Sequence, residues 1–226
     1  MKLIEPDSLA LTVDAVNEAM FFERTLSKSD RQQAARWIAA RQGLPGAYAN
    51  MFAPTKKDFQ TGLTLFTGEK ISSRVGLAHI LGQESRRLLN LLDIKSAEVK
   101  KAMEEADNGF LEYMRRYIRA EEGMYCCTMC SCVFWRRMSA APLEDSERIL
   151  ANAVKTLKSF RDGKGRWEKF PFYYTLLLLS DIKLPSAEQE MRYTAPACER
   201  LLKKEITKDK IAQRRRILAE RILEKC

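Results

Sequence analysis

The sequence has little of what marks fibrous, low-complexity or membrane-spanning chains. Only 10 glycines and 7 prolines occur among 226 residues, which excludes collagen-like and Gly/Pro-rich chains. The longest aliphatic run, Leu176–Leu179, is far shorter than the roughly 20 apolar residues that cross a bilayer. The first residues, MKLIEPDSLALTVDAV, contain no continuous apolar stretch, so we expect no signal peptide. A hydrophobic fraction of 46% nevertheless provides a buried core for a single domain over 1–226.

Motifs of the common enzyme classes are also missing. The sequence contains no Gly-x-x-x-x-Gly-Lys-[Ser/Thr] phosphate loop, no nucleophile elbow, no zinc-protease helix and no dinucleotide fingerprint. The one histidine, His79, lies in an apolar helical context without an obvious carboxylate or nucleophile beside it in sequence. We therefore expect His79 to be structural, and the protein to have no catalytic residue and no cofactor.

Positive charge is concentrated at the C-terminal end. The whole chain has a net charge of +9, and residues 200–226 hold ten bases against four acids, which leaves +6 there. A basic helix of this kind attracts phosphates, and Arg214, Arg215 and Arg216 are its candidate nucleic-acid contacts. The alternative is a solvated helix face whose bases suit a helix C-terminus. We favour this alternative, so nucleic-acid binding is the less favoured function.

Four of the six cysteines lie close together in the segment Cys126-Cys127-Thr-Met-Cys130-Ser-Cys132. Six cysteines without a secretory signal indicate free thiols in a reducing compartment, and hence a cytoplasmic protein. Cys127 and Cys130 form a C-x-x-C pair, which makes them candidates for a redox or metal site. On a helix, however, Cys132 would point away from Cys130. We expect no metal, and we favour cysteines that pack in a buried helix as small apolar residues.

The segments between turns have the apolar spacing of helices. Apolar residues recur at three- and four-residue intervals, as in Leu9/Val13/Val16/Met20, Phe59/Leu63/Phe66, Phe110/Met114/Tyr117 and Leu150/Val154/Leu157. No segment shows sustained alternation of apolar and polar residues between hairpin turns. The pattern predicts about ten helices with short connections, and therefore an all-α fold.

Capping residues predict where some helices begin and end. Ser29–Gln32 and Ser186–Gln189 fit the capping box of a helix N-terminus, and Gly68 and Gly109 fit helix C-caps. Pro196 interrupts a helical pattern, so we expect a kink or break just before it.

Two regions of the chain align with each other at a shift of 113 residues. The windows 59–89 and 172–202 share eight identical pairs in 31 positions. A helix that ends in a glycine loop precedes each window: the first glycine loop is Arg41–Pro54, and the second is Arg161–Trp167. Two explanations stay open, an internal duplication of 1–113 and 114–226, or the shared composition of Leu-rich helices.

The second glycine loop carries a family resemblance. Asp162, Gly163, Gly165 and Trp167, followed by the Leu-rich stretch Phe172–Leu179, resemble the repeat of prenyltransferases and squalene cyclases. The resemblance implies paired helices (α/α repeats) in an arc or partial toroid of the terpenoid-cyclase type. The family's acidic, diphosphate-metal and zinc motifs are missing, so no catalytic residue carries over. The alternative is that Gly-x-Gly-x-Trp is only a favourable turn between helices.

The two glycine loops also hold the best candidate binding residues. We expect the loops to border one concave site with aromatic walls and a cationic rim, formed by Tyr48, Asn50, Phe52, Arg161, Arg166, Trp167 and Tyr173. The alternative is that these aromatic residues only anchor helix ends.

These observations lead to three hypotheses about function. The favoured one is a non-catalytic binding or interaction protein, whose partner is a helix of an unknown protein or an anionic, isoprenoid-like amphiphile. A second hypothesis is a prenyltransferase- or terpenoid-cyclase-like enzyme, which would need a cluster of carboxylates from Asp58, Glu84, Asp162 and Glu190. The third is nucleic-acid binding by the basic C-terminal helix.

Overall fold

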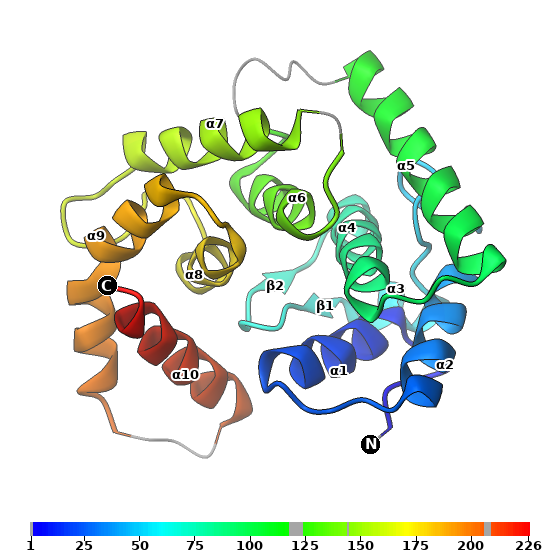
Figure 1. Ribbon diagram of the computed structural model, residues 1–226, viewed down its shortest axis with the longest axis horizontal. Helices are drawn as coiled ribbons and strands as arrows, with labels where there is room; N and C mark the ends of the chain where they lie inside the picture. The colour runs from blue at the N-terminus through cyan, green and yellow to red at the C-terminus, as the bar shows by residue number, and fades with distance from the viewer. Residues whose placement is uncertain (1, 118–123, 144, 206–208) are drawn as a thin grey trace. The chain divides into compact units, whose positions relative to one another are not determined.

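The protein is an all-α chain that divides into two compact units. The computed structural model describes residues 2–117, 124–143, 145–205 and 209–226, which contain ten helices and one two-stranded sheet (Figure 1). The first unit consists of Met1–Leu65 and Lys70–Arg119, and the second unit consists of Phe66–Glu69 and Ala120–Cys226. The predicted all-α class is confirmed. None of the described helices is both long and apolar enough to cross a membrane.

The first unit is built around one buried helix. Its elements, in chain order, are α1 (Leu9–Phe21), α2 (Lys28–Ala39), α3 (Lys56–Thr61), β1 (Leu63–Thr64), β2 (Lys70–Ile71), α4 (Arg74–Leu92) and α5 (Ala97–Tyr117). Helix α4 packs against α1, α2 and α5, and most of its side chains are buried. Leu9, Val13 and Val16 of the predicted stripe lie on the buried face of α1, whereas Met20 is only partly buried.

A polar network lies inside the first unit. Glu84 and Arg87 of α4 are each 3% exposed and form an ion pair at 3.0 Å. Asn17 of α1 donates a hydrogen bond to the same Glu84 oxygen at 3.0 Å and accepts one from Arg87. Because buried charges are costly unless they are paired and hydrogen-bonded, this network fixes how α1 packs on α4.

The second unit also surrounds a buried helix. Its helices are α6 (Thr128–Ala140), α7 (Ser146–Ser159), α8 (Phe172–Asp181), α9 (Pro185–Leu202) and α10 (Lys210–Glu224). The Leu-rich α8 packs against α6, α9 and α10, while α7 contacts α6 and α9 (Figure 1). Leu176–Leu179, the longest aliphatic run of the sequence, is buried in α8. This all-apolar burial explains why the run shows no amphipathic period.

The tetrapeptide Phe66–Glu69 completes the second unit. The Glu69 carboxylate accepts a hydrogen bond from the backbone N–H of Tyr174, at the start of α8, at 3.2 Å. Arg214 and Arg215 of α10 donate to the backbone carbonyls of Phe66 and Thr67 at 3.1 and 2.7 Å. These contacts join the beginnings of α8 and α10 to a piece of chain that is distant in sequence.

Several predicted helix ends are wrong. Helix α2 is capped by Ser27, whose side chain accepts a hydrogen bond from the N–H of Asp30, so the capping box at Ser29–Gln32 does not form. Helix α9 starts at Pro185 without a side-chain cap, so Ser186–Gln189 is no capping box either. Helix α9 also continues through Pro196, so a break is absent there and only the kink stays a prediction.

The two predicted glycine caps are wrong as well. Gly68 lies in the turn between β1 and β2, and Gly109 lies inside α5. A Cβ at Gly109 would lie 2.5 Å from Cβ of Asn50, so this glycine allows the first glycine loop to approach α5. The stripe Phe59/Leu63/Phe66 is likewise not one helix, because α3 ends at Thr61 and Leu63 begins β1.

The internal duplication and the arc of α/α repeats stay predictions. Residues 59–68, which align with α8 in the sequence, form the end of α3 and strand β1 rather than a continuous helix. Residues 74–89 and 187–202, in contrast, are helical in both aligned windows, within α4 and α9.

Candidate functional site

The first glycine loop is closed by backbone pairing. Gln42 and Phe52 form an isolated antiparallel bridge, and the N–H of Gly43 donates to the carbonyl of Met51 at 2.8 Å. The guanidinium of Arg41 donates to the carbonyls of Ala53 and Pro54, at 3.0 Å for the latter. The segment between α2 and α3 is thus a hydrogen-bonded loop and contains no helix, as the sequence predicts.

The three candidate ligand residues of this loop have different surroundings. Phe52 is fully buried, so it packs in the core and does not line a surface site. Tyr48 packs against the rings of His79 and Tyr113, at centroid distances of 4.8 and 5.0 Å. Asn50 is exposed, with a φ of 56°, and lies against Gly109 of α5.

Asn50 lines a wide pocket of the first unit. The pocket has a volume of about 480 Å³ and is lined by Ala49, Asn50, Glu105, Asn108, Gly109, Glu112, Tyr113 and Arg116. Its one cation, Arg116, is paired with Glu112 and its other charged residue is Glu105. The pocket therefore lacks the cationic rim that an anionic ligand requires.

His79 is structural in this environment. Its side chain is only 2% exposed, and burial lowers its pKa to about 3. The imidazole is therefore neutral at pH 7, and it packs against Tyr48 inside the first unit.

The second glycine loop is held by two carboxylates. Arg161 and Trp167 form an isolated antiparallel bridge. Within the turn, Asp162 accepts hydrogen bonds from the N–H groups of Arg166 and Lys164 at 2.9 and 2.7 Å, and these lower its pKa. The Tyr193 hydroxyl of α9 also donates to Asp162, at 3.0 Å.

Glu190 joins both ends of the second glycine loop. Arg161 donates to the two Glu190 oxygens at 3.1 and 2.8 Å, and the Trp167 indole N–H donates to one of them at 3.0 Å. Glu190 is 1% exposed and Trp167 is 4% exposed. The arginine and the tryptophan expected to bind a ligand instead close the loop on α9. Arg166 stacks on the ring of Phe172, with its guanidinium carbon 4.3 Å from the ring centroid.

Tyr173 lies in a pocket of the second unit, together with residues of α9 and α10. This pocket has a volume of about 220 Å³ and is lined by Tyr173, Leu201, Lys204, Glu205, Ala212, Gln213, Arg215 and Arg216. The guanidinium of Arg215 stacks on the Tyr173 ring, with its carbon 4.1 Å from the ring centroid. Its Nε donates to the carbonyl of Thr67, which holds the guanidinium in place. The pocket thus combines an aromatic wall with a fixed cation.

The charge of this pocket is predominantly positive. Lys204, Arg215 and Arg216 line it, against the single acid Glu205. Arg216 donates to the carbonyl of Leu202 at 2.9 Å and pairs with Glu220 at 3.2 Å, so part of its hydrogen-bonding capacity is used. Lys204 is exposed. Arg215 and Lys204 are therefore the cations best placed to meet an anion in the pocket.

The expected nucleic-acid surface does not form as one exposed patch. Arg214 is 3% exposed, and its guanidinium carbon lies 4.0 Å from the centroid of the Phe66 ring. This burial removes Arg214 from the residues that could reach a phosphate backbone. The three candidate arginines of α10 are therefore divided, with Arg214 in the core and Arg215 and Arg216 in the Tyr173 pocket.

The four carboxylates of the enzyme hypothesis are engaged in structural contacts. Asp58 is buried and accepts hydrogen bonds from the backbone N–H groups of Leu9 and Ala10, which start α1. Glu84 belongs to the network with Arg87, and Asp162 and Glu190 hold the second glycine loop. Neither of the two pockets described above is lined by any of these carboxylates.

The cysteines divide into buried and exposed thiols. Cys132 is fully buried, its sulfur lies 3.6 Å from the Thr175 hydroxyl, and burial raises its pKa to about 12. Cys130 is buried as well, whereas Cys126 and Cys127 are exposed. The expectation of core cysteines is therefore wrong for Cys126 and Cys127, because α6 begins only at Thr128.

Sequence reasoning missed the pairing of Tyr173 with Arg215. Both residues were candidates, but for different functions, since Tyr173 belongs to the Leu-rich segment and Arg215 to the basic C-terminal helix. Lys204 and Leu201 of the same pocket were not singled out. The available signal was the basic stretch from Arg200 to Arg216, which has apolar residues between its bases.

Comparisons with known proteins add no relative. No protein-family model, curated protein or solved structure matches this chain.

Proposed function

We propose that the second unit is a binding module for a small anion that carries a short apolar group, such as an alkyl phosphate. The observation that carries the proposal is the stacked pair of Tyr173 and Arg215 in a positively charged pocket. A guanidinium held by a backbone carbonyl loses little freedom when it binds an oxyanion, and it offers a planar pair of donors to it.

The pocket's size supports a small ligand. Its volume of about 220 Å³ lies below the roughly 300–1,000 Å³ of pockets for drug-sized molecules. Leu201, Ala212 and the Tyr173 ring provide apolar surface for a short chain. The proposed function is therefore non-catalytic. The expected ligand is an amphiphile with an anionic headgroup and an apolar chain of only a few carbons.

The direct test is calorimetric titration with hexyl phosphate, with inorganic phosphate and hexanol as separate probes. We expect hexyl phosphate to bind with a Kd of about 1 mM or tighter, and more tightly than either part alone. Because the attraction is electrostatic, the affinity should fall as the salt concentration rises from about 0.05 to about 0.5 M.

Two variants test the residues, and each has a matched control. Arg215→Gln should weaken hexyl phosphate at least about tenfold, whereas Arg221→Gln removes the same charge from α10 outside the pocket and should not. Lys204→Gln should weaken it by a smaller factor, and its exposed neighbour Lys203→Gln should leave it unchanged. Lys204 is at the surface, so this variant stays informative if Arg215→Gln disturbs the fold.

Two results would contradict the proposal. One is the absence of any binding by the unaltered protein at low salt. The other is equal affinity of the unaltered protein, Arg215→Gln and Lys204→Gln, which would place the anion elsewhere.

A further inference from the structure

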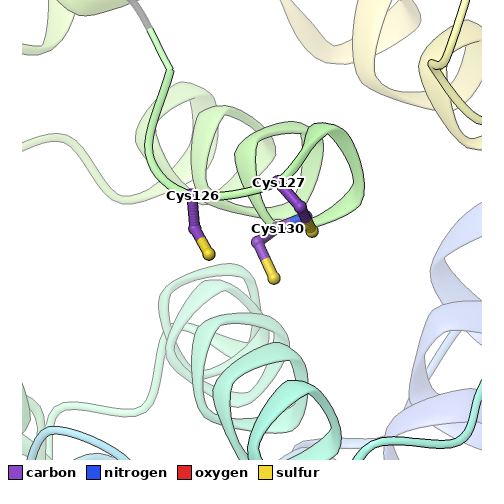
Figure 2. Close-up of side chains that lie close together, drawn as sticks. All are labelled: Cys126, Cys127 and Cys130. Carbon is purple, nitrogen blue, oxygen red and sulfur yellow. The ribbon is translucent and has the colours of Figure 1, made fainter.

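Three thiols converge at the start of α6. The sulfurs of Cys126, Cys127 and Cys130 all lie within 4.8 Å of one another. Figure 2 shows the three side chains together at the N-terminal end of the helix, with their sulfurs on the same side. The proposed binding pocket contains none of these residues, so they form a separate site.

The spacing of the sulfurs fits a metal ion. Zinc–sulfur bonds of about 2.3 Å in tetrahedral geometry separate two sulfurs by roughly 3.8 Å. In this structure the sulfurs lie within 4.8 Å of one another. A small rotation of the two exposed side chains, Cys126 and Cys127, would bring the sulfurs to the spacing of a zinc site. A disulfide, in contrast, would require two of the sulfurs to approach to about 2.05 Å.

The start of α6 aims a backbone N–H group at one of the three sulfurs. Cys127 is the N-cap of α6, and the N–H of Cys130 points at its sulfur, 3.5 Å away. An N–H group and the positive end of a helix dipole beside the sulfurs suit the negative charge that metal-bound sulfur ligands carry. Burial and the two neighbouring thiols raise the pKa of Cys130, so without a cation this thiol stays protonated.

The backbone around the thiols is held by neighbouring groups. The buried Ser131 hydroxyl accepts hydrogen bonds from the N–H groups of Tyr125 and Cys126, at 2.9 and 3.4 Å. The Thr128 hydroxyl donates to the carbonyl of Lys169 at 2.7 Å. These bonds fix the turn that carries Cys126 and Cys127 beside Cys130, so the site needs little rearrangement to accept an ion.

We propose that Cys126, Cys127 and Cys130 form a three-thiolate site for a thiophilic d¹⁰ ion, Zn²⁺ or Cu⁺. Soft sulfur ligands select these ions over Mg²⁺ and Ca²⁺. No fourth His, Cys, Asp or Glu joins the cluster among the residues that the structure describes. Cu⁺ is satisfied by three sulfurs, whereas Zn²⁺ takes a water as its fourth ligand. On binding, each S–H proton leaves to solvent and a sulfur–metal bond replaces it, without any change of oxidation state.

The test uses the full chain, reduced and free of metal, in anaerobic buffer. Co²⁺, a spectroscopic substitute for Zn²⁺, should give sulfur-to-cobalt charge-transfer absorption at about one ion per chain, and Zn²⁺ should displace it. A parallel arm measures Cu⁺ by competition with a chromophoric chelator. A complex of one ion per chain in either arm supports the site. Protons released on binding are counted in weakly buffered solution.

Cysteine-to-serine variants locate the site. Cys126→Ser and Cys127→Ser change exposed side chains and should fold normally, yet each should lower the affinity at least about 100-fold. Cys226→Ser removes an exposed thiol outside the cluster and should bind like the unaltered protein. Cys130→Ser should also abolish binding, and a thermal melt shows whether that variant is folded.

Three outcomes would overturn the proposal. The first is that neither ion binds the reduced protein. The second is that Cys126→Ser and Cys127→Ser bind as tightly as Cys226→Ser. The third is that the reduced protein takes up no metal and, when dioxygen is then admitted as oxidant, forms a disulfide among the three cysteines, detected by mass spectrometry, which would identify a redox pair.

Discussion

The two glycine loops reach a similar closure by different chemistry. Each follows a helix and is pinched by one isolated antiparallel bridge, Gln42 with Phe52 in the first loop and Arg161 with Trp167 in the second. The first loop relies on backbone pairing and on a buried phenylalanine. The second encloses fewer residues and relies on two carboxylates: Asp162 accepts the N–H groups of its turn, and Glu190 accepts hydrogen bonds from both residues of the bridge. Cations and aromatic residues in such a loop are thus no sign of a ligand when a buried carboxylate faces them.

The largest expected effect comes from removing the buried aromatic residue of each bridge. Phe52→Ala and Trp167→Ala should each lower the free energy of unfolding by about 3–5 kcal/mol, because each leaves a cavity. Urea titration followed by circular dichroism measures the change. The exposed Leu44→Ala and Lys164→Ala serve as controls in the same loops, with expected losses below about 1 kcal/mol. A small loss in either aromatic variant would show that its loop does not depend on the buried ring.

The next largest effect is a difference in how the stability of the two loops depends on pH, because His79 packs on Tyr48 of the first loop. The folded pKa of His79, about 3, lies below its ordinary value of 6.5, so its contribution is complete above about pH 6.5 and is lost as the pH falls. The loss should approach about 1.4 kcal/mol per pH unit below that point. We expect His79→Gln to remove this slope between about pH 6 and pH 4.5, measured by urea titration at each pH. Parallel curves for the two proteins would contradict it.

Asp162 of the second loop responds only at lower pH. Its folded pKa lies below its ordinary value of 3.8, so its contribution is present above about pH 4 and is lost below it. The two loops therefore depend on pH in different ranges: the first loses stability from about pH 6.5 downward, and the second only below about pH 4.

A smaller effect should follow from Glu190→Gln. The variant weakens the hydrogen bonds to Arg161 and Trp167, and we expect a loss of about 1–3 kcal/mol. Glu188→Gln, in the same helix but in an exposed pair with Arg192, should change stability by less than about 0.5 kcal/mol. If both variants behaved alike in thermal melts, the second loop would not depend on its buried carboxylate.

The smallest effect concerns the glycines at positive φ. Gly163 has a φ of 75° and open space around its missing Cβ, so Gly163→Ala should cost about 1 kcal/mol from backbone conformation alone. Gly43 has a φ of 67°, and a Cβ there would lie 3.0 Å from Oδ1 of Asn50, so Gly43→Ala should cost slightly more. Equal or opposite ranking in urea titrations would show that Asn50 moves freely.

The sequence predicts the helices better than their ends. Leu150, Val154 and Leu157 fall on one buried face of α7, since apolar spacing reflects packing directly. The cap of α2 was placed two residues late, because Ser27 and Ser29 both precede suitable residues and only the folded chain selects between them.

The candidate site was predicted only in part. Tyr173 was identified as a binding residue and Arg215 as a phosphate contact, but their pairing depends on how α8 and α10 pack. The spacing of residues along the chain carries no information on that packing. Trp167 was expected to line a binding site. In the structure its indole instead donates a hydrogen bond to the buried Glu190, so this tryptophan holds the loop on α9.

The contribution of Phe66–Glu69 to the second unit also affects how the protein is made and divided. A fragment that starts at residue 120 would lack the carbonyl groups to which Arg214 and Arg215 donate. It would also lack the Glu69 carboxylate, which accepts a backbone N–H in the first turn of α8. During translation, this tetrapeptide leaves the ribosome long before α10, so it meets Arg214 and Arg215 only when synthesis is almost finished. The second unit therefore cannot be excised as one continuous piece of the gene.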